Sequence, residues 1–364
     1  MGMMDQAAVR AATEQFAVGG AFVEAIPWGN GHIHDTFRVE MDAGGARRHS
    51  VLQRINESVF PRVAELMENV ERVTAHIEKQ LTYQADWERR ISRLIPTRGG
   101  RTWIRDDRGA CWRMFAFIEG ARSVERVETA EQCYRAARAF GEFQRQLTTL
   151  PGPRLHDTIP DFHHTPKRFA ALEQAIAADA AGRAATALAE IEFALARKPM
   201  TRVLLDAGLP ERITHNDTKI NNVLLDELTG EALCVIDLDT VMPGLALYDF
   251  GDLVRTATSS AAEDELELEK VFLRMDYYQA LVEGYLSSAG PFLTAPEREL
   301  LAFSGKLITF ETGIRFLADH LNGDTYFKVH REGHNLDRCR SQFRLVASIE
   351  DREHQMSRLA TAPA

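Results

Sequence analysis

Residues 214–226, Thr-His-Asn-Asp-Thr-Lys-Ile-Asn-Asn-Val-Leu-Leu-Asp, decide the fold of this chain together with Val-Ile-Asp at 235–237. The two apolar runs predict a pair of strands joined by a tight turn. Asp217 then lies on the loop before this hairpin, Asn222 at the start of its first strand and Asp237 at the end of its second. Two carboxylates and an amide in this arrangement indicate phosphoryl transfer, in which one carboxylate accepts a hydroxyl proton and the other two groups hold magnesium.

Asp217 is the expected base, although alone it could simply cap a helix, because Asn-Asp-Thr is favourable N-cap chemistry. The combination of His215, Asn222 and Asp237 with it favours the catalytic interpretation. We expect Asn222 and Asp237 to be the metal ligands. His215 is expected to order the loop in support of catalysis, since its backbone position precedes the turn.

Two further charged residues lie close to this set in the sequence. Lys219 could neutralise charge that develops on the transferring phosphoryl group, or it could be an ordinary solvated lysine. Asp239 follows Asp237 by two residues, and it could help to hold metal or water, or it could merely orient the loop.

The tripeptide Asp249-Phe-Gly, which marks the magnesium loop of protein kinases, invites a different assignment. A metal-binding Asp should close the hairpin directly, as Asp237 does, whereas Asp249 follows a Pro-Gly break. We therefore expect Asp249 and Asp252 to begin a helix, or to brace the catalytic loop through hydrogen bonds.

The composition is that of an ordinary globular protein, since 45% of the 364 residues are hydrophobic and 26% are charged, and no apolar run is long enough to span a membrane. A formal charge of −10 argues against a nucleic-acid partner, because such partners are bound by clustered Lys and Arg. The first residues lack a secretory signal and the cysteines lack paired spacing, so we expect a cytoplasmic protein with buried thiols. The pair His163 and His164 lacks the companions of a zinc site.

The order of elements predicts a β-rich part followed by a helical part. In the β-rich part, apolar residues at helical spacing predict one helix between Pro61 and Lys79. Strand-like segments are expected at residues 22–51, 103–104 and 112–118, with turns at 29–31, 44–45 and 106–109.

After residue 119 the pattern changes to long helical segments, such as the one from Glu131 to Leu147. The Ala-rich stretch 175–189 should be a plain helix, and the acidic run 263–269 is most simply a solvated helix face. We predict an α+β fold with two domains, residues 1–119 for nucleotide binding and 120–364 for catalysis and substrate binding, with a ligand cleft between them.

The first part carries the expected nucleotide-binding residues. Its Gly-Asn-Gly segment could form a loop whose backbone N–H groups approach the phosphates. Strand alternation places Leu52 and Arg54 on one face, so Leu52 could cover the adenine while Arg54 meets the α- and β-phosphates. An acidic partner for Arg54 is expected on the following helix among Glu65, Glu68 and Glu71, and we prefer Glu71. The expected cofactor-binding set is Gly29, Gly31, Leu52, Arg54, Glu71, Phe117 and Ile118.

With these residues in place, the chain resembles the aminoglycoside phosphotransferase and choline kinase superfamily, whose pattern is His-x-Asp-x4-Asn followed by Ile-Asp. The matching residues are His215, Asp217, Asn222 and Ile236-Asp237. The longer sequence segments at 215–224 and 235–244, with Leu-Gln-Arg-Ile-Asn at 52–56, are similar to those of a narrower branch of this superfamily, the bacterial N-acetylhexosamine 1-kinases. The resemblance spans most of the chain and implies a two-lobed, protein-kinase-like fold that uses ATP and Mg²⁺.

Such enzymes transfer the γ-phosphoryl group of ATP to the anomeric hydroxyl of N-acetylglucosamine or N-acetylgalactosamine, so the resemblance implies an amino sugar as the small-molecule substrate. It also implies that Arg315 and Tyr326 contact the sugar. Asp319 is a further candidate, because Arg, Asp, Asn and Tyr gather in this stretch, although an ordinary polar helix end is the alternative. The alternative functions are a same-fold kinase of another hydroxyl compound, such as an aminoglycoside, choline or another sugar, and a catalytically silent nucleotide-binding module.

Overall fold

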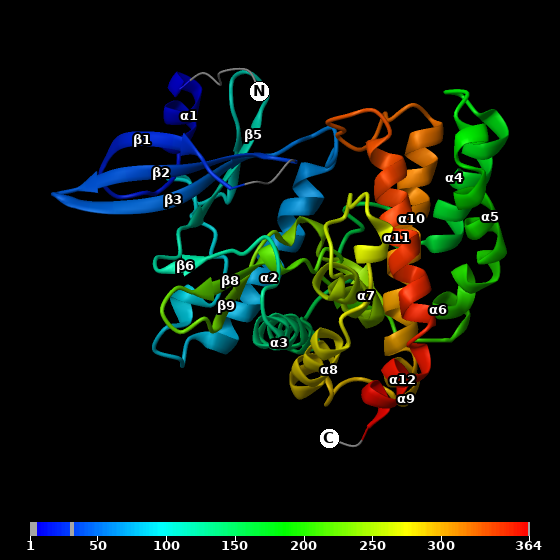
Figure 1. Cartoon of the computed structure of the whole chain (residues 1–364). Coiled ribbons are helices and arrows are strands. Elements are labelled where there is room, and N and C mark those ends of the chain that lie inside the picture. The colour runs from blue at the N-terminus through cyan, green and yellow to red at the C-terminus, as the bar shows by residue number, and fades with distance from the viewer. Residues whose placement is uncertain (1–5, 30–32, 363–364) are drawn as a thin grey trace. The chain divides into compact units, whose positions relative to one another are not determined.

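The computed structural model describes residues 6–29 and 33–362, and the chain forms two compact units that are described one at a time (Figure 1). Unit 1 comprises Met1–Arg122, Thr149–Ile159 and Leu224–Met242, and unit 2 comprises Ser123–Thr148, Pro160–Val223 and Pro243–Ala364. The predicted α+β class is confirmed, with a small antiparallel sheet and a larger helical part. The proposed division at residues 119 and 120 stays a prediction about domains.

Unit 1 is built on a five-stranded antiparallel sheet in the order β1-β2-β3-β5-β4. The turns predicted at 44–45 and 106–109 are confirmed, and they join β2 to β3 and β4 to β5. The strands are β1 (Ala21–Pro27), β2 (Asp35–Ala43), β3 (Ala46–Arg54), β4 (Trp103–Arg105) and β5 (Cys111–Ala116).

The two faces of this sheet carry different side chains. One face packs against α1 (Gln6–Thr13), where Leu52 lies in a buried apolar cluster with residues such as Val9, Val39 and Met114. Because side chains alternate along a strand, Gln53 and its cross-strand partner Arg113 belong to the opposite face. The predicted helix after β3 is confirmed as α2 (Val63–Leu81).

A smaller sheet completes unit 1 and contains the predicted hairpin. It has the order β6-β8-β9, formed by β6 (Ala121–Arg122), β8 (Val223–Asp226) and β9 (Ala232–Val235). A short 3₁₀ turn, η5 (Leu238–Thr240), follows β9. The buried apolar cluster of this smaller sheet consists of Ile118, Leu233 and Cys234.

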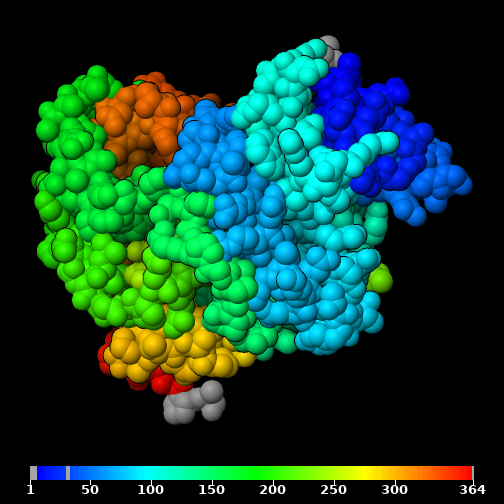
Figure 2. All heavy atoms as spheres, turned by 180° about the vertical axis from the view of Figure 1, so that it is seen from behind, coloured from blue at the N-terminus to red at the C-terminus, as the bar shows by residue number. Residues whose placement is uncertain are grey.

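Unit 2 is mainly helical, and its centre is α10 (Leu301–Leu321), whose Phe310, Ile314 and Leu317 are buried. In Figure 2 the green helices α4 and α5 form part of the surface of this unit. The other α-helices are α3 (Ala130–Leu147), α4 (Thr165–Ala178), α5 (Leu188–Ala196), α6 (Val203–Asp206), α7 (Ala246–Thr258), α8 (Met275–Ala289), α9 (Ala295–Glu299), α11 (His334–Glu350) and α12 (Glu353–Thr361). Two short strands, β7 (Arg212–Thr214) and β10 (Met242–Gly244), pair with each other.

Helices α3 and α8 approach closely because glycine occupies the contact. A Cβ atom on Gly284 would lie 2.2 Å from the carbonyl oxygen of Tyr134, and one on Gly141 would lie 2.4 Å from the Oγ of Ser288. Real Cβ atoms do not come so near, so an alanine at either position would push the two helices apart.

Two predictions about helices in this unit are wrong. The Ala-rich stretch 175–189 is not one helix, because α4 ends at Ala178. Its C-cap Asp179 adopts a left-handed conformation (φ 37°) and accepts hydrogen bonds from the backbone N–H groups of Arg183 and Ala184. Turn chemistry at an Asp therefore outweighs the helix propensity of alanine. The acidic run 263–269 contains only the beginning of a short 3₁₀ turn, Leu268–Lys270.

Among the described residues, no helix has the length and apolarity that crossing a bilayer requires. The same residues contain no group of three or more His, Cys, Asp or Glu side chains suited to a metal ion. The four cysteines are buried and unpaired, as predicted.

Candidate active site

The loop after β7 that carries Asp217 is fixed by the carboxylate of Asp249 on α7. This carboxylate accepts hydrogen bonds from the backbone N–H groups of His215 (2.9 Å) and Asn216 (2.7 Å). Asn216 has a positive φ of 66°, a conformation that costs less for Asn than for most residues. The prediction that Asp249 braces the catalytic loop is confirmed, and the Asp-Phe-Gly tripeptide lies within a helix.

The Asp249 carboxylate is itself held by a second layer of hydrogen bonds. The Nε2 of Gln144 donates to it (2.6 Å), and the hydroxyl of Tyr285 donates to the Oε1 of Gln144 (2.5 Å). Burial raises the pKa of Asp249, although the nearby His215 and the N–H donors act against this rise. Thr218 adds a hydrogen bond to the carbonyl oxygen of Asp249 (2.6 Å), so both sides of Asp217 are tied to α7.

His215 is a supporting residue. Its side chain is fully buried and lies edge-on to Phe140 and Phe143. Its Nδ1 accepts a hydrogen bond from the backbone N–H of Asp217 (3.3 Å). The imidazole therefore shapes the loop, which agrees with the ordering role expected for it.

His163 is a site residue that the sequence did not reveal. Its Nε2 contacts the carbonyl oxygen of Asn216 (3.0 Å) and its Nδ1 contacts a carboxylate oxygen of Glu311 (2.8 Å). A carbonyl and a carboxylate only accept hydrogen bonds, so both ring nitrogens must carry protons and His163 is an imidazolium. Burial opposes this charge, but Glu311 outweighs burial and raises the pKa of His163. No spacing in the sequence links positions 163, 216 and 311.

Asp217 lies between two donors. Its Oδ1 is 2.8 Å from the ammonium of Lys219, and its Oδ2 accepts a 3.2 Å hydrogen bond from the Nδ2 of Asn222. Burial alone would raise the pKa of Asp217, but the Lys219 charge holds it below its usual value. The side chains of Asp217 and Lys219 are 25% and 44% exposed, so the carboxylate is ionised and accessible.

The expected metal ligands have suitable chemistry. The Nδ2 of Asn222 also donates to the carbonyl oxygen of Asp217 (2.8 Å), so the amide nitrogen is committed and the oxygen Oδ1 is the atom suited to a cation. Asp237 follows β9 in unit 1 and has a positive φ of 62°. One carboxylate and one amide oxygen fit magnesium, which binds few protein ligands and completes its shell with phosphates and water.

Asp239 is engaged elsewhere, and the structure does not support it as a metal ligand. Its carboxylate is buried in unit 1, where Arg113 binds both oxygens and His34 contacts Oδ2 (2.5 Å). Burial opposes ionisation, but Arg113 and His34 hold the pKa of Asp239 far below its ordinary value. Asp239 therefore orients its loop, which is the second of the two roles that the sequence left open.

The expected nucleotide-binding residues have varied surroundings in unit 1. Leu52 is fully buried against the α1 side of the sheet, so adenine contact would require this core to open. Arg54 pairs with Asp35 (Nε to Oδ2, 2.8 Å), whereas Glu71 accepts a hydrogen bond from Thr102. The preferred pairing of Arg54 with Glu71 is therefore replaced by a cross-strand pair, because Asp35 lies directly opposite Arg54 in the sheet.

The loop predicted at Gly29 and Gly31 is described only in part, because Gly31 lies outside the described residues. Gly29 has a positive φ of 76°, and no other described residue, apart from its chain neighbours, has a heavy atom within 4 Å of the place that a Cβ would take. This backbone geometry suits a glycine turn after β1.

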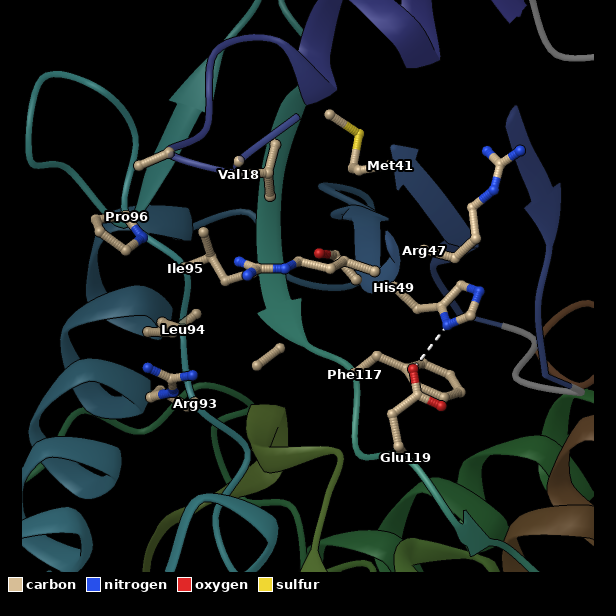
Figure 3. A pocket seen from close by; sticks show the side chains of 15 residues that line it. Val18, Met41, Arg47, His49, Arg93, Leu94, Ile95, Pro96, Phe117 and Glu119 are labelled. Carbon is tan, nitrogen blue, oxygen red and sulfur yellow. Dashed lines mark hydrogen bonds and ion pairs between the residues drawn. The ribbon is translucent and has the colours of Figure 1, made fainter. Parts of the chain in front are cut away.

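Unit 1 contains a cavity of about 470 Å³ beside the ends of β3 and β5 (Figure 3). Phe117 lines it, and so do the cationic side chains of Arg47, Arg48 and Arg93. His49, also in its wall, contacts Glu119 (2.7 Å). Ile118, by contrast, belongs to the buried cluster of the smaller sheet, so its side chain is a packing residue.

Arg315 on α10 lies among aromatic rings of unit 2. Its guanidinium carbon is 5.7 Å from the ring centre of Phe162, 6.0 Å from that of Tyr326 and 5.4 Å from that of Phe327. Tyr326 is 70% exposed, so its ring is available to a ligand. Burial would raise the pKa of Glu311, but its partner His163 lowers it, and the Arg315 charge adds a smaller contribution in the same direction.

Asp319 builds the loop that carries Tyr326, and the structure does not support it as a sugar contact. Its buried carboxylate accepts hydrogen bonds from the backbone N–H groups of Thr325 (2.9 Å), Tyr326 (2.8 Å) and Phe327 (2.9 Å). The side chain of Asn335 donates a fourth (2.9 Å). With the hydroxyl of Thr325, which is 3.4 Å from Oδ1, five donors leave little capacity for a ligand hydroxyl, so the Asp319 carboxylate holds the loop of Tyr326.

Comparison with solved structures shows that the fold is shared. A microcompartment-associated aminopropanol kinase is 17% identical, with a TM-score of 0.60 and coverage of 97% of this chain and 99% of that chain. A spectinomycin phosphotransferase in complex with ADP and spectinomycin is 13% identical, with a TM-score of 0.57 and coverage of 98% and 100%. A choline kinase from Cryptosporidium parvum Iowa II is 14% identical, with a TM-score of 0.57 and coverage of 96% and 97%.

The sequence itself matches the family model described as "Phosphotransferase enzyme family" over residues 24–290, which is most of the chain. That range contains the braced loop of Asp217, Asn222 and the Ile-Asp pair after β9. The chain therefore belongs to the phosphotransferase enzyme family.

Proposed function

We propose that this protein is an ATP-dependent kinase that phosphorylates the anomeric hydroxyl of an N-acetylhexosamine, N-acetylglucosamine or N-acetylgalactosamine. The observation that carries the proposal is the ionised, accessible Asp217 on a loop braced by Asp249 and His163. Membership of the phosphotransferase family supports the proposal, and so does the resemblance of the motifs at 215–224 and 235–244 to those of N-acetylhexosamine 1-kinases.

In the proposed reaction, the acceptor hydroxyl oxygen forms a bond to the γ-phosphorus of ATP while the bond from that phosphorus to the β–γ bridging oxygen breaks. The hydroxyl proton passes to Asp217, and ADP leaves with the bridging oxygen. The rigid loop positions the carboxylate, which is the main contribution of the protein to such transfers. The Lys219 ammonium lies beside the base and would counter charge on the transferring group.

We assign Asn222 and Asp237 as the residues that would hold Mg²⁺, and this assignment rests on the motif spacing and on the chemistry of their oxygens. The ion, when bound, would neutralise negative charge on the phosphates. Arg54 is proposed to contact the nucleotide phosphates through its guanidinium, since its side chain is 42% exposed even though it pairs with Asp35.

The surroundings of Arg315 favour a sugar over a cationic acceptor. Arg168 lies near Arg315, and burial together with the Arg315 charge lowers the pKa of Arg168. An acceptor such as choline, an amino alcohol or an aminoglycoside would bring a further positive charge to two guanidinium groups. A neutral N-acetyl sugar can instead accept hydrogen bonds from Arg315 and place its ring against the exposed face of Tyr326.

The test is a coupled assay of ADP release with a panel of acceptors. We expect N-acetylglucosamine or N-acetylgalactosamine to give the highest kcat/KM, and phosphorus NMR to identify a sugar 1-phosphate. A higher kcat/KM with choline, aminopropanol or an aminoglycoside would overturn the substrate assignment but keep the kinase. No ADP release with any acceptor, despite nucleotide binding, would favour the silent-module alternative.

A further inference from the structure

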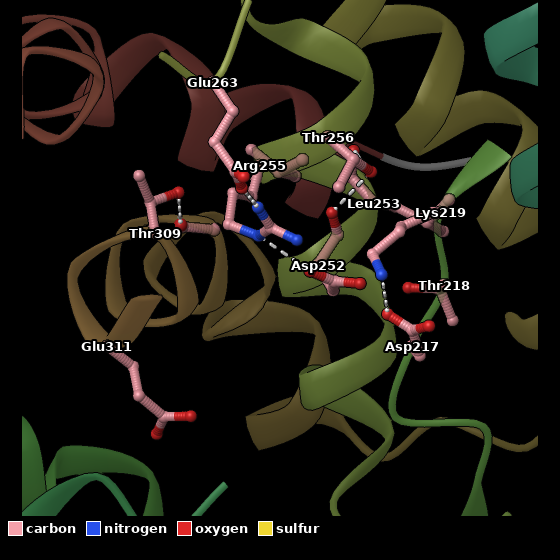
Figure 4. A network of polar contacts seen from close by, with 12 residues as sticks. Asp217, Thr218, Lys219, Asp252, Leu253, Arg255, Thr256, Glu263, Thr309 and Glu311 are labelled. Atoms are coloured by element: carbon pink, nitrogen blue, oxygen red, sulfur yellow. Dashed lines mark hydrogen bonds and ion pairs between the residues drawn. The ribbon is translucent and has the colours of Figure 1, made fainter. Parts of the chain in front are cut away.

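Helix α7 carries a second buried carboxylate, Asp252, one turn beyond Asp249 (Figure 4). Its side chain is 5% exposed, and its Oδ1 accepts a 2.8 Å hydrogen bond from the Nε of Arg255. The Nη1 of Arg255 is bound in turn by Glu263 (2.8 Å). Arg255 is thus held by two carboxylates, and its bond to Asp252 leaves the remaining oxygen of that carboxylate without a partner in the described part of the chain.

That remaining oxygen, Oδ2 of Asp252, is buried and has no hydrogen-bond partner in the described part of the chain. A buried carboxylate oxygen without a donor is costly, so such atoms call for an explanation. The nearest explanation is Lys219, whose ammonium pKa is raised by Asp217 first and also by Asp252, although burial opposes the rise. In Figure 4 the side chains of Lys219, Asp217 and Asp252 gather at one place, and the hydrogen bond of Lys219 goes to Asp217.

In this arrangement each oxygen of Asp217 has a donor, and donors to a carboxylate stabilise its charged form and make it a weaker base. Oδ1 contacts Lys219 and Oδ2 contacts the side chain of Asn222. Release of one donor would therefore favour transfer of a hydroxyl proton to Asp217. Asn222 is buried and makes a second bond to the Asp217 backbone, whereas Lys219 is 44% exposed and has a long, rotatable stem.

We propose that Asp252 is a positioning residue that takes the ammonium of Lys219 on its Oδ2 when Asp217 turns to the acceptor hydroxyl. The proposal rests on the proposed kinase function. It explains why a carboxylate oxygen without a partner is kept in the interior, and it lets Lys219 leave the base without losing a counter-charge. The charged groups around Lys219 are then Asp217, Asp252 and Arg255.

The test variant is Asp252→Asn, which keeps an oxygen for Arg255 and replaces the Oδ2 acceptor with an N–H donor. We expect kcat to fall up to about 100-fold, the scale of a misplaced catalytic group, with KM for ATP unchanged. Glu263→Gln is the matched control, because it removes the charge of the other partner of Arg255 and leaves the Oδ2 of Asp252 in place. The control should keep kcat near the wild-type value.

A double-mutant cycle with Lys219→Met separates positioning from mere packing. If Asp252 acts through Lys219, Asp252→Asn should cause no further loss of kcat in the Lys219→Met background. An equal loss of kcat in both backgrounds would overturn the proposal, and so would equal losses in Asp252→Asn and Glu263→Gln.

A measurement that needs no acceptor distinguishes failure of this inference from failure of the kinase assignment. The rate at which a small acylating reagent modifies Lys219, followed by peptide mass spectrometry across pH, reports its free-amine fraction. Loss of the Asp252 charge should make Lys219 react at lower pH, whereas Glu263→Gln should leave its reactivity unchanged. An unchanged Lys219 profile in Asp252→Asn overturns the inference, even if the wild-type protein phosphorylates no acceptor in the panel.

Discussion

The imidazolium of His163 donates a hydrogen bond to the carbonyl oxygen of Asn216, and the two atoms are 3.0 Å apart. Asn216 has a left-handed backbone conformation directly before Asp217, so this bond fixes the peptide that carries the proposed base. The other side of the same imidazolium is held by Glu311 of α10. A buried ion pair thus supports a strained loop.

The ion pair should make stability depend on pH. Glu311, whose pKa is lowered from 4.5, contributes above that pH, and His163, whose pKa is raised from 6.5, contributes fully below 6.5 and loses its contribution as pH rises through its folded-state pKa. Glu311→Gln should cost about 3–5 kcal/mol of unfolding free energy between pH 4.5 and 6.5, and less at higher pH. Urea unfolding across pH measures this difference.

Glu297→Gln is the matched control for this pH dependence. Glu297 is also buried and ion-paired, but its partner is Arg212, which keeps its proton throughout this range. Its cost should stay constant from pH 6 upward. If the cost of Glu311→Gln is equally constant, His163 is not the titrating partner.

Asp217→Asn should lower kcat by about 10² or more, the usual scale for a lost general base, while nucleotide binding and thermal stability change little. The substitution keeps the shape of the side chain but removes its basicity and the charge that pairs with Lys219. Steady-state kinetics and calorimetric nucleotide titration measure the two effects. Asp206→Asn, a 57% exposed carboxylate on α6, should leave both unchanged. Near-normal turnover of Asp217→Asn would contradict the role of base.

The paired variants Asp239→Asn and Asp237→Asn should behave in opposite ways. Asp239→Asn leaves the buried guanidinium of Arg113 without its carboxylate, so we expect a loss of about 3–5 kcal/mol in unfolding free energy. Asp237→Asn should preserve stability, because Asn tolerates a positive φ, and it should abolish magnesium-dependent nucleotide binding.

Denaturation and calorimetry with and without Mg²⁺ distinguish these outcomes. A stable Asp239→Asn variant that loses the magnesium dependence would restore Asp239 as a metal ligand. Loss of stability in both variants would instead mean that Asp237 also has a structural role.

Asp319→Asn should raise KM for the acceptor more than it changes kcat or KM for ATP. The amide presents one acceptor oxygen where the carboxylate has two, so some of the four N–H groups bound by Asp319 would lose their partner and the loop of Tyr326 would loosen. The accompanying loss of stability should be about 1–3 kcal/mol. An unchanged acceptor KM would show that this loop does not contact the acceptor.

The local elements of the fold could be predicted because their signals are local. Turn residues at 44–45 and 106–109 and the apolar periodicity of α2 and α3 each specify one element from neighbouring residues. The Asp217 loop also followed from spacing in a single stretch, whereas bracing of this loop was one of two roles that the sequence left open for Asp249. The break in the Ala-rich helix was missed because the side chain of Asp179 satisfies backbone donors that alanine propensity ignores.

Long-range partners could not be predicted, because the sequence contains no spacing rule for them. Arg113 with Asp239 and His163 with Glu311 join residues separated by 126 and 148 positions. Asp239 and Asp319 resemble ligand-binding acids in the sequence, and only their neighbours show that their oxygens are already bound. A motif read in isolation therefore predicts the type of reaction more reliably than it predicts which residues bind the ligands.

Unit 1 draws on three separate stretches of the chain, the last of which ends at Met242. During synthesis, β1 to β5 leave the ribosome long before β8 and β9, which complete the smaller sheet with β6. More than a hundred further residues must therefore be synthesised before unit 1 can complete its folding. A truncated N-terminal fragment would expose the apolar surface of Ile118, so expression of the first 119 residues alone should yield an aggregating product.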